Sequence, residues 1–112
     1  MELAFANTKL AKELADEKTL VRKYGPDNGR RICQRLVQLT AAENLEVLRS
    51  LPQMRAHELA GDRAGQISVD LKHPRRLLLA SDHTETPRKP DGGLDWKQVT
   101  KVKILGIFDT HG

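Results

Sequence analysis

The side chains best suited to acid–base and phosphate chemistry gather in one segment and at one end of the chain. They are His57, Arg63, His73, Arg75 and Arg76, followed much later by Asp109 and His111. Histidine exchanges protons readily because its pKa lies near neutral pH. Arginine stays charged, and its planar fork donates two parallel hydrogen bonds to a phosphate. These are the residue types that phosphoester chemistry uses when no metal takes part.

The segment that carries five of them has the turn signals of a three-stranded meander. Gly61-Asp62 and Gly65 mark one turn, and Lys72-His73-Pro74 marks another. Residues 66–71 alternate in polarity, as a half-buried strand does. One side carries Ile67, Val69 and Leu71, and the other carries Gln66, Ser68 and Asp70. Residues 76–80 form an apolar run typical of a central strand, so the polar candidates lie at or near strand ends.

The elements before this segment are predicted to be one strand and then helices. Residues 2–6 alternate and predict the first strand, and Asn7 and Thr8 can cap a helix that follows. Leucines at helical spacing predict this helix from about Lys9 to Tyr24. Gly25-Pro26 ends it and starts the next one.

The second helix is predicted from about Pro26 to Leu39, and the two long helices should form a hairpin. Its apolar stripe consists of Ile32, Leu36 and Leu39, with Cys33 and Val37 alongside. Cys33 is expected in the core. Arg30, Arg31 and Arg35 are expected on its other faces, either as a solvated surface or as contacts for nucleic-acid phosphates. A further short helix is predicted over residues 41–48.

The last third of the chain is predicted to be a long surface loop and a final strand. Residues 81–98 are polar and rich in Pro and Gly, and Leu94 and Trp96 could hold this loop against the body. Residues 99–108 form the strand. Lys101 and Lys103 should share one face, opposite Val102, Ile104 and Phe108. Gly106 suits a bulge or a close backbone approach. The predicted fold is α+β, in the order β-α-α-β-β-β-β, with one mainly antiparallel sheet against an N-terminal helical hairpin.

Length and composition set further bounds. At 112 residues the chain is expected to be one domain, residues 1–112. The net charge of +4 permits a polyanion partner, and the basic residues are spread without a basic tail. Cys33 is the single cysteine, which excludes an internal disulfide and a cysteine-built zinc site and suits a reducing cytosol. The sequence has no run of transmembrane length and no secretory signal pattern, so a cytoplasmic protein without membrane contact is expected.

These residues together resemble the HigB branch of the RelE/ParE superfamily of bacterial toxins. Residues 51–71 are similar to the family's pattern of His, Leu and Gly-Asp-Arg-x-Gly leading into a strand. Arg76 falls where the family has an arginine at the start of the next strand, and Asp109 and His111 resemble its closing Asp-x-His. The resemblance covers nearly the whole chain in element order. Thr110 departs from the tyrosine that the family often has, and the loop 81–98 is longer than in compact members.

The resemblance implies a toxin of a type II toxin–antitoxin system that cleaves mRNA on the ribosome without a metal or another cofactor. The implied partners are the ribosome, mRNA and a helix-turn-helix antitoxin from the same operon, with operator DNA bound only through the antitoxin complex. The chain itself has no helix-turn-helix pattern. Two other functions stay open: a ParE-like gyrase inhibitor without nuclease activity, and an inactive relative that only binds its antitoxin.

The implied site divides into two groups of residues. The catalytic group is His57, Arg76, Asp109 and His111, and the group that contacts RNA phosphates is Arg63, Arg75, His73, Lys101 and Lys103. In such a site one group takes the proton from the 2′-OH, cations offset charge on the phosphate, and an acid protonates the leaving 5′-oxygen. The assignment of acid and base stays open.

Structural alternatives exist for each of these residues. His57 could be a hydrogen-bonded structural histidine, and Arg76 could form a bridge to Asp70. Arg63 could pair with Asp62 or contact the antitoxin. His73 could simply be exposed, Asp109 could fix the C-terminal turn, and His111 could be a disordered tail residue. Lys101 and Lys103 could form a solvated face.

Overall fold

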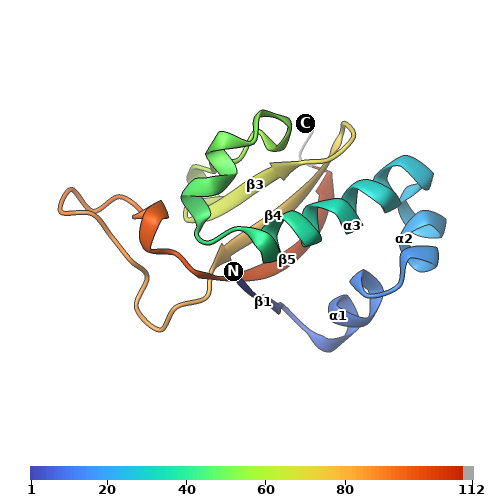
Figure 1. The fold of residues 1–112 in the computed structure, drawn as a ribbon, viewed down its shortest axis with the longest axis horizontal. Helices are drawn as coiled ribbons and strands as arrows, with labels where there is room; N and C mark the ends of the chain where they lie inside the picture. The colour runs from blue at the N-terminus through green and yellow to red at the C-terminus, as the bar shows by residue number, and fades with distance from the viewer. Residues whose placement is uncertain (110–112) are drawn as a thin grey trace.

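A five-stranded sheet runs through the molecule, with the strand order β1-β5-β4-β3-β2 (Figure 1). The computed structural model describes residues 1–109. The strands are β1 (Glu2–Phe5), β2 (His57–Glu58), β3 (Gln66–Asp70), β4 (Arg75–Ser81) and β5 (Lys101–Asp109). β1 pairs with β5 in parallel, and the other neighbours are antiparallel. The predicted α+β class, the mainly antiparallel sheet and the 57–80 meander are confirmed.

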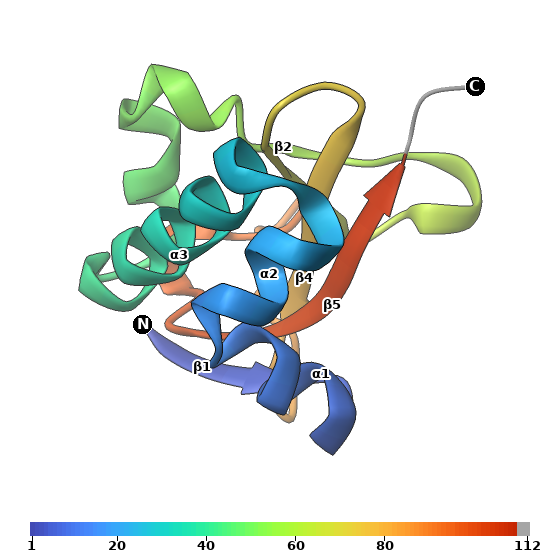
Figure 2. The same cartoon turned by 90° about the vertical axis from the view of Figure 1, so that its right-hand side faces the viewer.

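Three helices cover one face of this sheet (Figure 2). They are α1 (Thr8–Leu14), α2 (Glu17–Tyr24) and α3 (Pro26–Ala41). The core between the two layers contains, among others, Leu10, Leu14, Leu20, Ile32 and Leu39 from the helices and Ile67, Val69, Leu77, Leu79, Val102 and Ile104 from the strands. The apolar stripes predicted for the helices and for β3 contribute to this core, whereas predicted members such as Leu36 are only partly buried. Cys33 lies half-buried beside it, where burial raises the pKa of its thiol.

The single helix predicted from about Lys9 to Tyr24 is wrong, because the chain forms two helices there. α1 ends at Leu14 and α2 begins at Glu17. Asp16 stands between them in an extended conformation, and its side chain accepts hydrogen bonds from the Lys18 N–H at 3.1 Å and the Thr19 hydroxyl at 2.6 Å. A short carboxylate that caps the next turn competes with continued helix. The predicted hairpin is therefore formed by α2 and α3.

α2 and α3 meet at a contact that has room only for glycine. Gly25 turns the chain with a φ of 90°, and Pro26 occupies the first turn of α3, as predicted. A Cβ atom added to Gly29 would lie 2.6 Å from Cγ2 of Val21 and 2.8 Å from its backbone nitrogen. Gly29 therefore sets the distance between the two helices.

The further short helix predicted over residues 41–48 is confirmed only from Leu45 onward, where it is a 3-10 helix. α3 continues to Ala41, and Ala42 leaves the helical conformation with a ψ of 136°. Two 3-10 helices follow, Leu45–Ser50 and Pro52–Met54. Leu45 and Leu48 are both fully buried, and a spacing of three residues returns side chains to one side of a 3-10 helix. This packing explains why the shorter-period helix forms.

The loop between β4 and β5 is held against the body by two apolar side chains, as predicted. Leu94 is 7% exposed and Trp96 is 4% exposed. The guanidinium of Arg49 lies over the Trp96 ring at 3.7 Å. His83 anchors the other end of the loop, because its Nε2 accepts a hydrogen bond from the Thr100 N–H at 3.0 Å.

A bulge in β5 changes which face its last residues occupy. Leu78 pairs with Gly106, but the next residue of β4, Leu79, pairs with Ile104. Gly106 has a φ of +146°, a conformation that L side chains rarely adopt. Ile107 consequently packs against the core, and Phe108 lies across from Arg76 on the other face. The bulge at Gly106 is confirmed, whereas the prediction that Phe108 shares a face with Val102 and Ile104 is wrong.

Candidate functional site

The face of the sheet that the helices leave uncovered carries most of the candidate side chains, and we call it the polar face. Strand pairing places His57 beside Ser68, Ser68 beside Leu78, Asp70 beside Arg76, and Arg76 beside Phe108. Ser68 and Leu78 are nevertheless fully buried. The polar face is therefore a layer of polar groups around a small apolar centre, and it is not a fully solvated surface.

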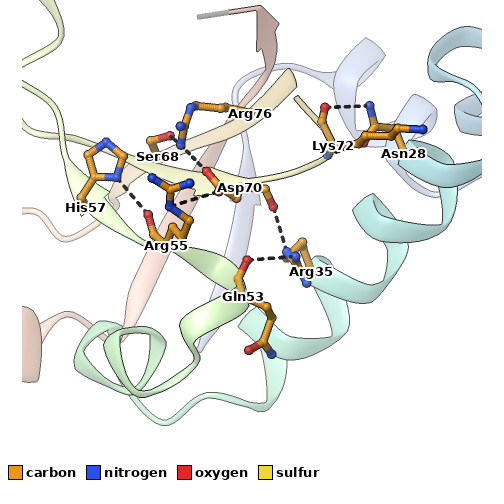
Figure 3. A network of polar contacts seen from close by, with 9 residues as sticks. All are labelled: Asn28, Arg35, Gln53, Arg55, His57, Ser68, Asp70, Lys72 and Arg76. Atoms are coloured by element: carbon orange, nitrogen blue, oxygen red, sulfur yellow. Dashed lines mark hydrogen bonds and ion pairs between the residues drawn. The ribbon is translucent and has the colours of Figure 1, made fainter. Parts of the chain in front are cut away.

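His57 is exposed on β2, and one of its ring nitrogens is oriented by the backbone. Nδ1 lies 2.9 Å from the carbonyl oxygen of Arg55 (Figure 3). A carbonyl oxygen only accepts hydrogen bonds, so Nδ1 carries the proton in this contact. In the neutral ring Nε2 is then the acceptor. His57 can thus take up a proton at Nε2 and later release it.

Arg76 is anchored on the polar face by two neighbours on β3. Its Nη1 donates to Ser68 Oγ at 3.2 Å and forms a close ion pair with the Asp70 carboxylate (Figure 3). The side chains of Arg76 and Asp70 are 26% and 18% exposed, so solvent screens this pair only in part. The bridge to Asp70 that the sequence offered as the structural alternative is present. Both contacts are made by the same nitrogen of the guanidinium, Nη1.

A second guanidinium reaches the same carboxylate from outside the sheet. Arg55 Nε lies 3.6 Å from the other oxygen of Asp70, and its side chain is 73% exposed. Arg55 adopts a left-handed conformation with a φ of 44°, which is uncommon for a residue other than glycine. Such a backbone is strained, and strained positions often occur at functional sites. Asp70 thus lies between two arginines.

These groups border a pocket of about 190 Å³ at the end of the sheet. It is lined by Arg55, Asp70, Leu71, His73, Pro74, Arg75 and Arg76. Three arginines and one aspartate line it, so its surroundings carry a net positive charge before His73 is counted, although the Arg75 guanidinium is directed toward Tyr24. An anionic group is the ligand that this lining favours.

Arg35 supports the site from the helix layer. It is 4% exposed, and its guanidinium donates to the carbonyl oxygens of Asp70 at 3.0 Å and Gln53 at 3.3 Å (Figure 3). Burial lowers the pKa of Arg35 below its ordinary value. The prediction of a solvated helix face is therefore wrong for this arginine, although Arg30 and Arg31 are exposed. Arg35 joins α3 to the end of β3 and to the segment that leads to Arg55.

The turn between β3 and β4 is attached to the start of α3. Asn28 accepts a hydrogen bond from the Lys72 N–H at 2.7 Å and donates one to its carbonyl at 3.3 Å (Figure 3). Lys72 Nζ also lies 3.0 Å from the Asp27 carboxylate, and this ammonium holds the pKa of Asp27 below its usual range. The backbone of residue 72, next to His73, is therefore fixed.

Arg75 points away from the polar face. Its guanidinium lies 5.5 Å from the centre of the Tyr24 ring at the end of α2, which places it on the helix side of β4. Burial raises the pKa of Tyr24. In the register, Asp109 lies directly across from Arg75. The structure therefore places Arg75 and Asp109 on the side of the sheet opposite to His57 and Arg76.

The remaining predicted residues are distributed as follows. Arg63 lies on an exposed turn, where it donates to Gln66 Oε1 at 3.3 Å and covers the Phe108 ring at 4.9 Å. Lys101 and Lys103 lie at the other end of β5, with Glu2 and Asp82 as ion-pair partners at 3.7 Å each. His111, like Thr110, lies outside the described residues. His57 and Arg76 thus both neighbour Ser68, His73 lines the pocket beside Arg76, and the two lysines lie apart from this group.

Sequence reasoning missed Arg55, Asp70 and Phe108 as parts of the site. Arg55 precedes His57 by two residues, and in an extended chain side chains at this spacing point to the same face. Asp70 lies on the polar side of the alternation in β3, and this position indicated that its side chain would lie on the polar face. Phe108 offered no such signal, because its face depends on the bulge.

Residues 1–109 contain neither a candidate metal site nor a candidate membrane-spanning helix. No group of three His, Cys, Asp or Glu side chains within this range is arranged to hold a metal ion. No helix in the same range has the length and apolar character needed to cross a membrane.

Comparison with known proteins gives one informative similarity. No protein-family model matches the chain, and no curated protein matches its sequence. Among solved structures, the chain is similar to the YoeB/ParE toxin from Agrobacterium tumefaciens, with a TM-score of 0.52. The alignment covers 99% of this chain and 100% of the toxin at 10% identity. At this identity the similarity concerns the fold alone, so the chain has an α+β fold like that of a YoeB/ParE toxin.

Proposed function

We propose that this chain is the toxin of a type II toxin–antitoxin system and cleaves mRNA on the ribosome. The observation that carries the proposal is the group formed by His57, Arg76, Arg55 and the cationic pocket beside them on the polar face. A fold like that of a YoeB/ParE toxin supports it. The HigB branch is the specific assignment that the sequence resemblance adds.

In this proposal His57 transfers protons. The contact between Nδ1 and the Arg55 carbonyl holds the ring so that Nε2 faces the substrate side. From there Nε2 takes the proton of the 2′-OH or, when charged, gives a proton to the 5′-oxygen. The second proton-transfer role falls to His111, with Asp109 to orient or balance a histidine. No metal or other cofactor enters this scheme.

Arg76 and Arg55 offset the charge that develops on the scissile phosphate. For Arg76 this requires that the phosphate share the guanidinium with Asp70 or replace the carboxylate. Arg63 and His73 contact flanking phosphates, and Lys101 and Lys103 contact RNA farther along β5. Arg75 is left out of these contacts, because its guanidinium lies on the helix side of β4. The ribosome supplies the orientation of the mRNA, which accounts for many powers of ten in such reactions.

The proposed partners follow from this activity. A helix-turn-helix antitoxin from the same operon neutralises the toxin, and operator DNA is reached only through their complex. Location in the cytoplasm is part of the proposal, since its target is the translating ribosome.

The test is a pulse-induction of the chain alone in a bacterial host, followed by mapping of new RNA 5′ ends. We expect cuts inside translated codons that disappear when translation initiation is blocked. His57→Ala and Arg76→Ala should each abolish the cuts and the growth arrest. Arg22→Ala is the matched control, because Arg22 is an exposed arginine on α2 in the helix layer. Full toxicity of both site variants would show that the site is elsewhere.

A gyrase inhibitor is the second candidate, and two observations favour it. The fold is similar to that of a toxin whose name includes ParE. In addition, α3 exposes an apolar patch formed by Leu36, Val37, Thr40 and Ala41, with Val37 68% exposed. Such a patch suits a protein partner. Growth arrest with a DNA-damage response and without new RNA ends would select this function. Soluble chain without growth arrest would indicate an inactive relative that only binds antitoxin.

A further inference from the structure

The ring of Phe108 is presented on the polar face by an unusual backbone. A Cβ atom on Gly106 would lie 3.2 Å from Cε2 and 3.4 Å from Cζ of Phe108. The ring therefore lies on the backbone of Gly106, in space that any side chain there would fill. Gly106 thus has two effects. Its backbone conformation allows the bulge that turns Phe108 to this face, and its lack of a side chain leaves room for the Phe108 ring.

The other side of the ring is covered by one movable side chain. The Arg63 guanidinium lies 4.9 Å from the ring centre, and Arg63 comes from an exposed turn. Its hydrogen-bond partner Gln66 is neutral and does not offset the charge of the guanidinium. The charge of Arg63 is therefore available to an anion. A flat group could enter between guanidinium and ring, or could replace the guanidinium on the ring.

The charges of the residues around Phe108 indicate which kind of flat group would bind to its ring. Arg76 lies across from it on β4, and Arg63 lies above it. An aromatic surface with a guanidinium on each of two sides matches a nucleobase whose flanking phosphates are anionic. Stacking on aromatic rings and on arginine is how proteins hold single-stranded bases. A plain apolar side chain of a protein partner would offer no counter-charge to Arg63, whereas Arg76 already has Asp70 as its partner.

We propose that Phe108, with Arg63, is a stacking site for one nucleobase of single-stranded RNA, next to the phosphate bound by Arg76. This inference rests on the proposed function and deepens it, because it names a residue that determines how the RNA is positioned. A base held on Phe108 fixes the backbone on one side of Arg76. Since the larger ring system of a purine stacks over more area, the site favours a purine at this position.

The test measures binding of a short single-stranded RNA that carries 2-aminopurine at successive positions, a base whose fluorescence falls on stacking. At one position we expect quenching by the wild type and loss of quenching with Phe108→Leu. Phe108→Leu should weaken binding of the intact RNA about tenfold. It should change binding of an RNA that is abasic at that position by less than about twofold. Phe108→Trp should retain both quenching and affinity.

Phe5→Leu is the matched control, because it removes a ring from the core side of the sheet, and it should leave both readings unchanged. Thermal unfolding of each variant confirms that the fold is intact. Equal weakening of intact and abasic RNA by Phe108→Leu, or failure of Phe108→Trp to restore quenching, would overturn the stacking site. So would the absence of RNA binding by the wild type at low salt.

The same variants, assayed for cleavage on translating ribosomes, separate this inference from the proposed function. Base-dependent binding without cleavage would leave the stacking site standing and refute the nuclease. Cleavage by Phe108→Leu at the wild-type rate, with no dependence of binding on the base, would refute the stacking site and leave the nuclease standing.

Discussion

Replacement of the buried Arg35 should destabilise the protein more than replacement of any exposed arginine. Its guanidinium makes three hydrogen bonds, two of them to the carbonyl oxygens of Asp70 and Gln53. Arg35→Met keeps an unbranched apolar stem of similar reach, so the change removes mainly the polar contacts. A carbonyl left unsatisfied in a buried position costs about 1–3 kcal/mol. Two such groups give an expected loss of about 3 kcal/mol.

A loss of this size is large for a domain whose total stability is about 5–15 kcal/mol. It should lower the melting temperature by about 10–15 °C, given a shift of roughly 4 °C for each kcal/mol at this chain length. Urea unfolding followed by circular dichroism measures the free energy of unfolding directly, and an unchanged slope would show that the unfolded state is not altered.

Arg30→Met is the matched control on the same helix. The Arg30 side chain is 65% exposed and lies 3.5 Å from Asp27, so its removal should cost less than about 1 kcal/mol. If Arg35→Met and Arg30→Met had equal effects, the argument that Arg35 ties α3 to the strand end would be refuted.

Three further predictions concern the contacts that hold the helices and the β3–β4 turn. Gly29→Ala should destabilise by about 2 kcal/mol, measured by urea unfolding, because the new methyl group would force α3 away from Val21; a gain in stability would show that the helices separate easily. Asn28→Ala should lower the melting temperature by several degrees, since it removes both hydrogen bonds to Lys72, and an unchanged value would show that the turn does not need them. The lowered pKa of Asp27 implies that its stabilisation is present above the usual value of 3.8 and is lost as the pH falls through the lower folded value. The urea midpoints of wild type and Asp27→Asn should therefore differ near pH 6 and approach each other as the pH falls below 3.8. A difference that does not change with pH would refute this direction.

The meander could be predicted because its signals are local. The alternation from Gln66 to Asp70 and the glycines before it determine strand and turn over a few residues. α3 was predictable for the same reason, since Gly25-Pro26 marks its start and the leucine and isoleucine positions mark its buried side. His57 and Arg76 come close because both neighbour Ser68, which follows once the strands pair in register.

The features that were missed depend on distant or competing contacts. Asp16 interrupts the first helix because capping of the next turn competes with helix continuation, and the leucine spacing does not reveal which one wins. Arg35 is buried because two carbonyls, 35 and 18 residues away in the chain, supply its partners. Periodicity in the helix cannot indicate these partners.

The face of Phe108 shows the same limit within a strand. Strict alternation placed it with Val102 and Ile104, and one extra residue in β5 reversed that assignment. Gly106 suggested that a bulge was possible. The side to which Phe108 turns became clear only when Leu78 and Leu79 were matched to their partners across the strands.

Asp70 connects the helix layer to the proposed site, because its backbone contacts one and its side chain contacts the other. Its carbonyl oxygen accepts from the buried Arg35, while its carboxylate holds Arg76 and lies near Arg55 on the other side of the sheet. A shift of α3 against β3 would therefore move the residue that orients both guanidinium groups. Since a catalytic guanidinium must be positioned closely to be effective, the stability of the Arg35 contact and the activity of the polar face should fall together. Arg35→Met assayed for RNA cleavage, at a temperature where the variant is folded, should thus lose activity, whereas Gly29→Ala, which alters the packing of α2 against α3, should lose less at equal folded fraction.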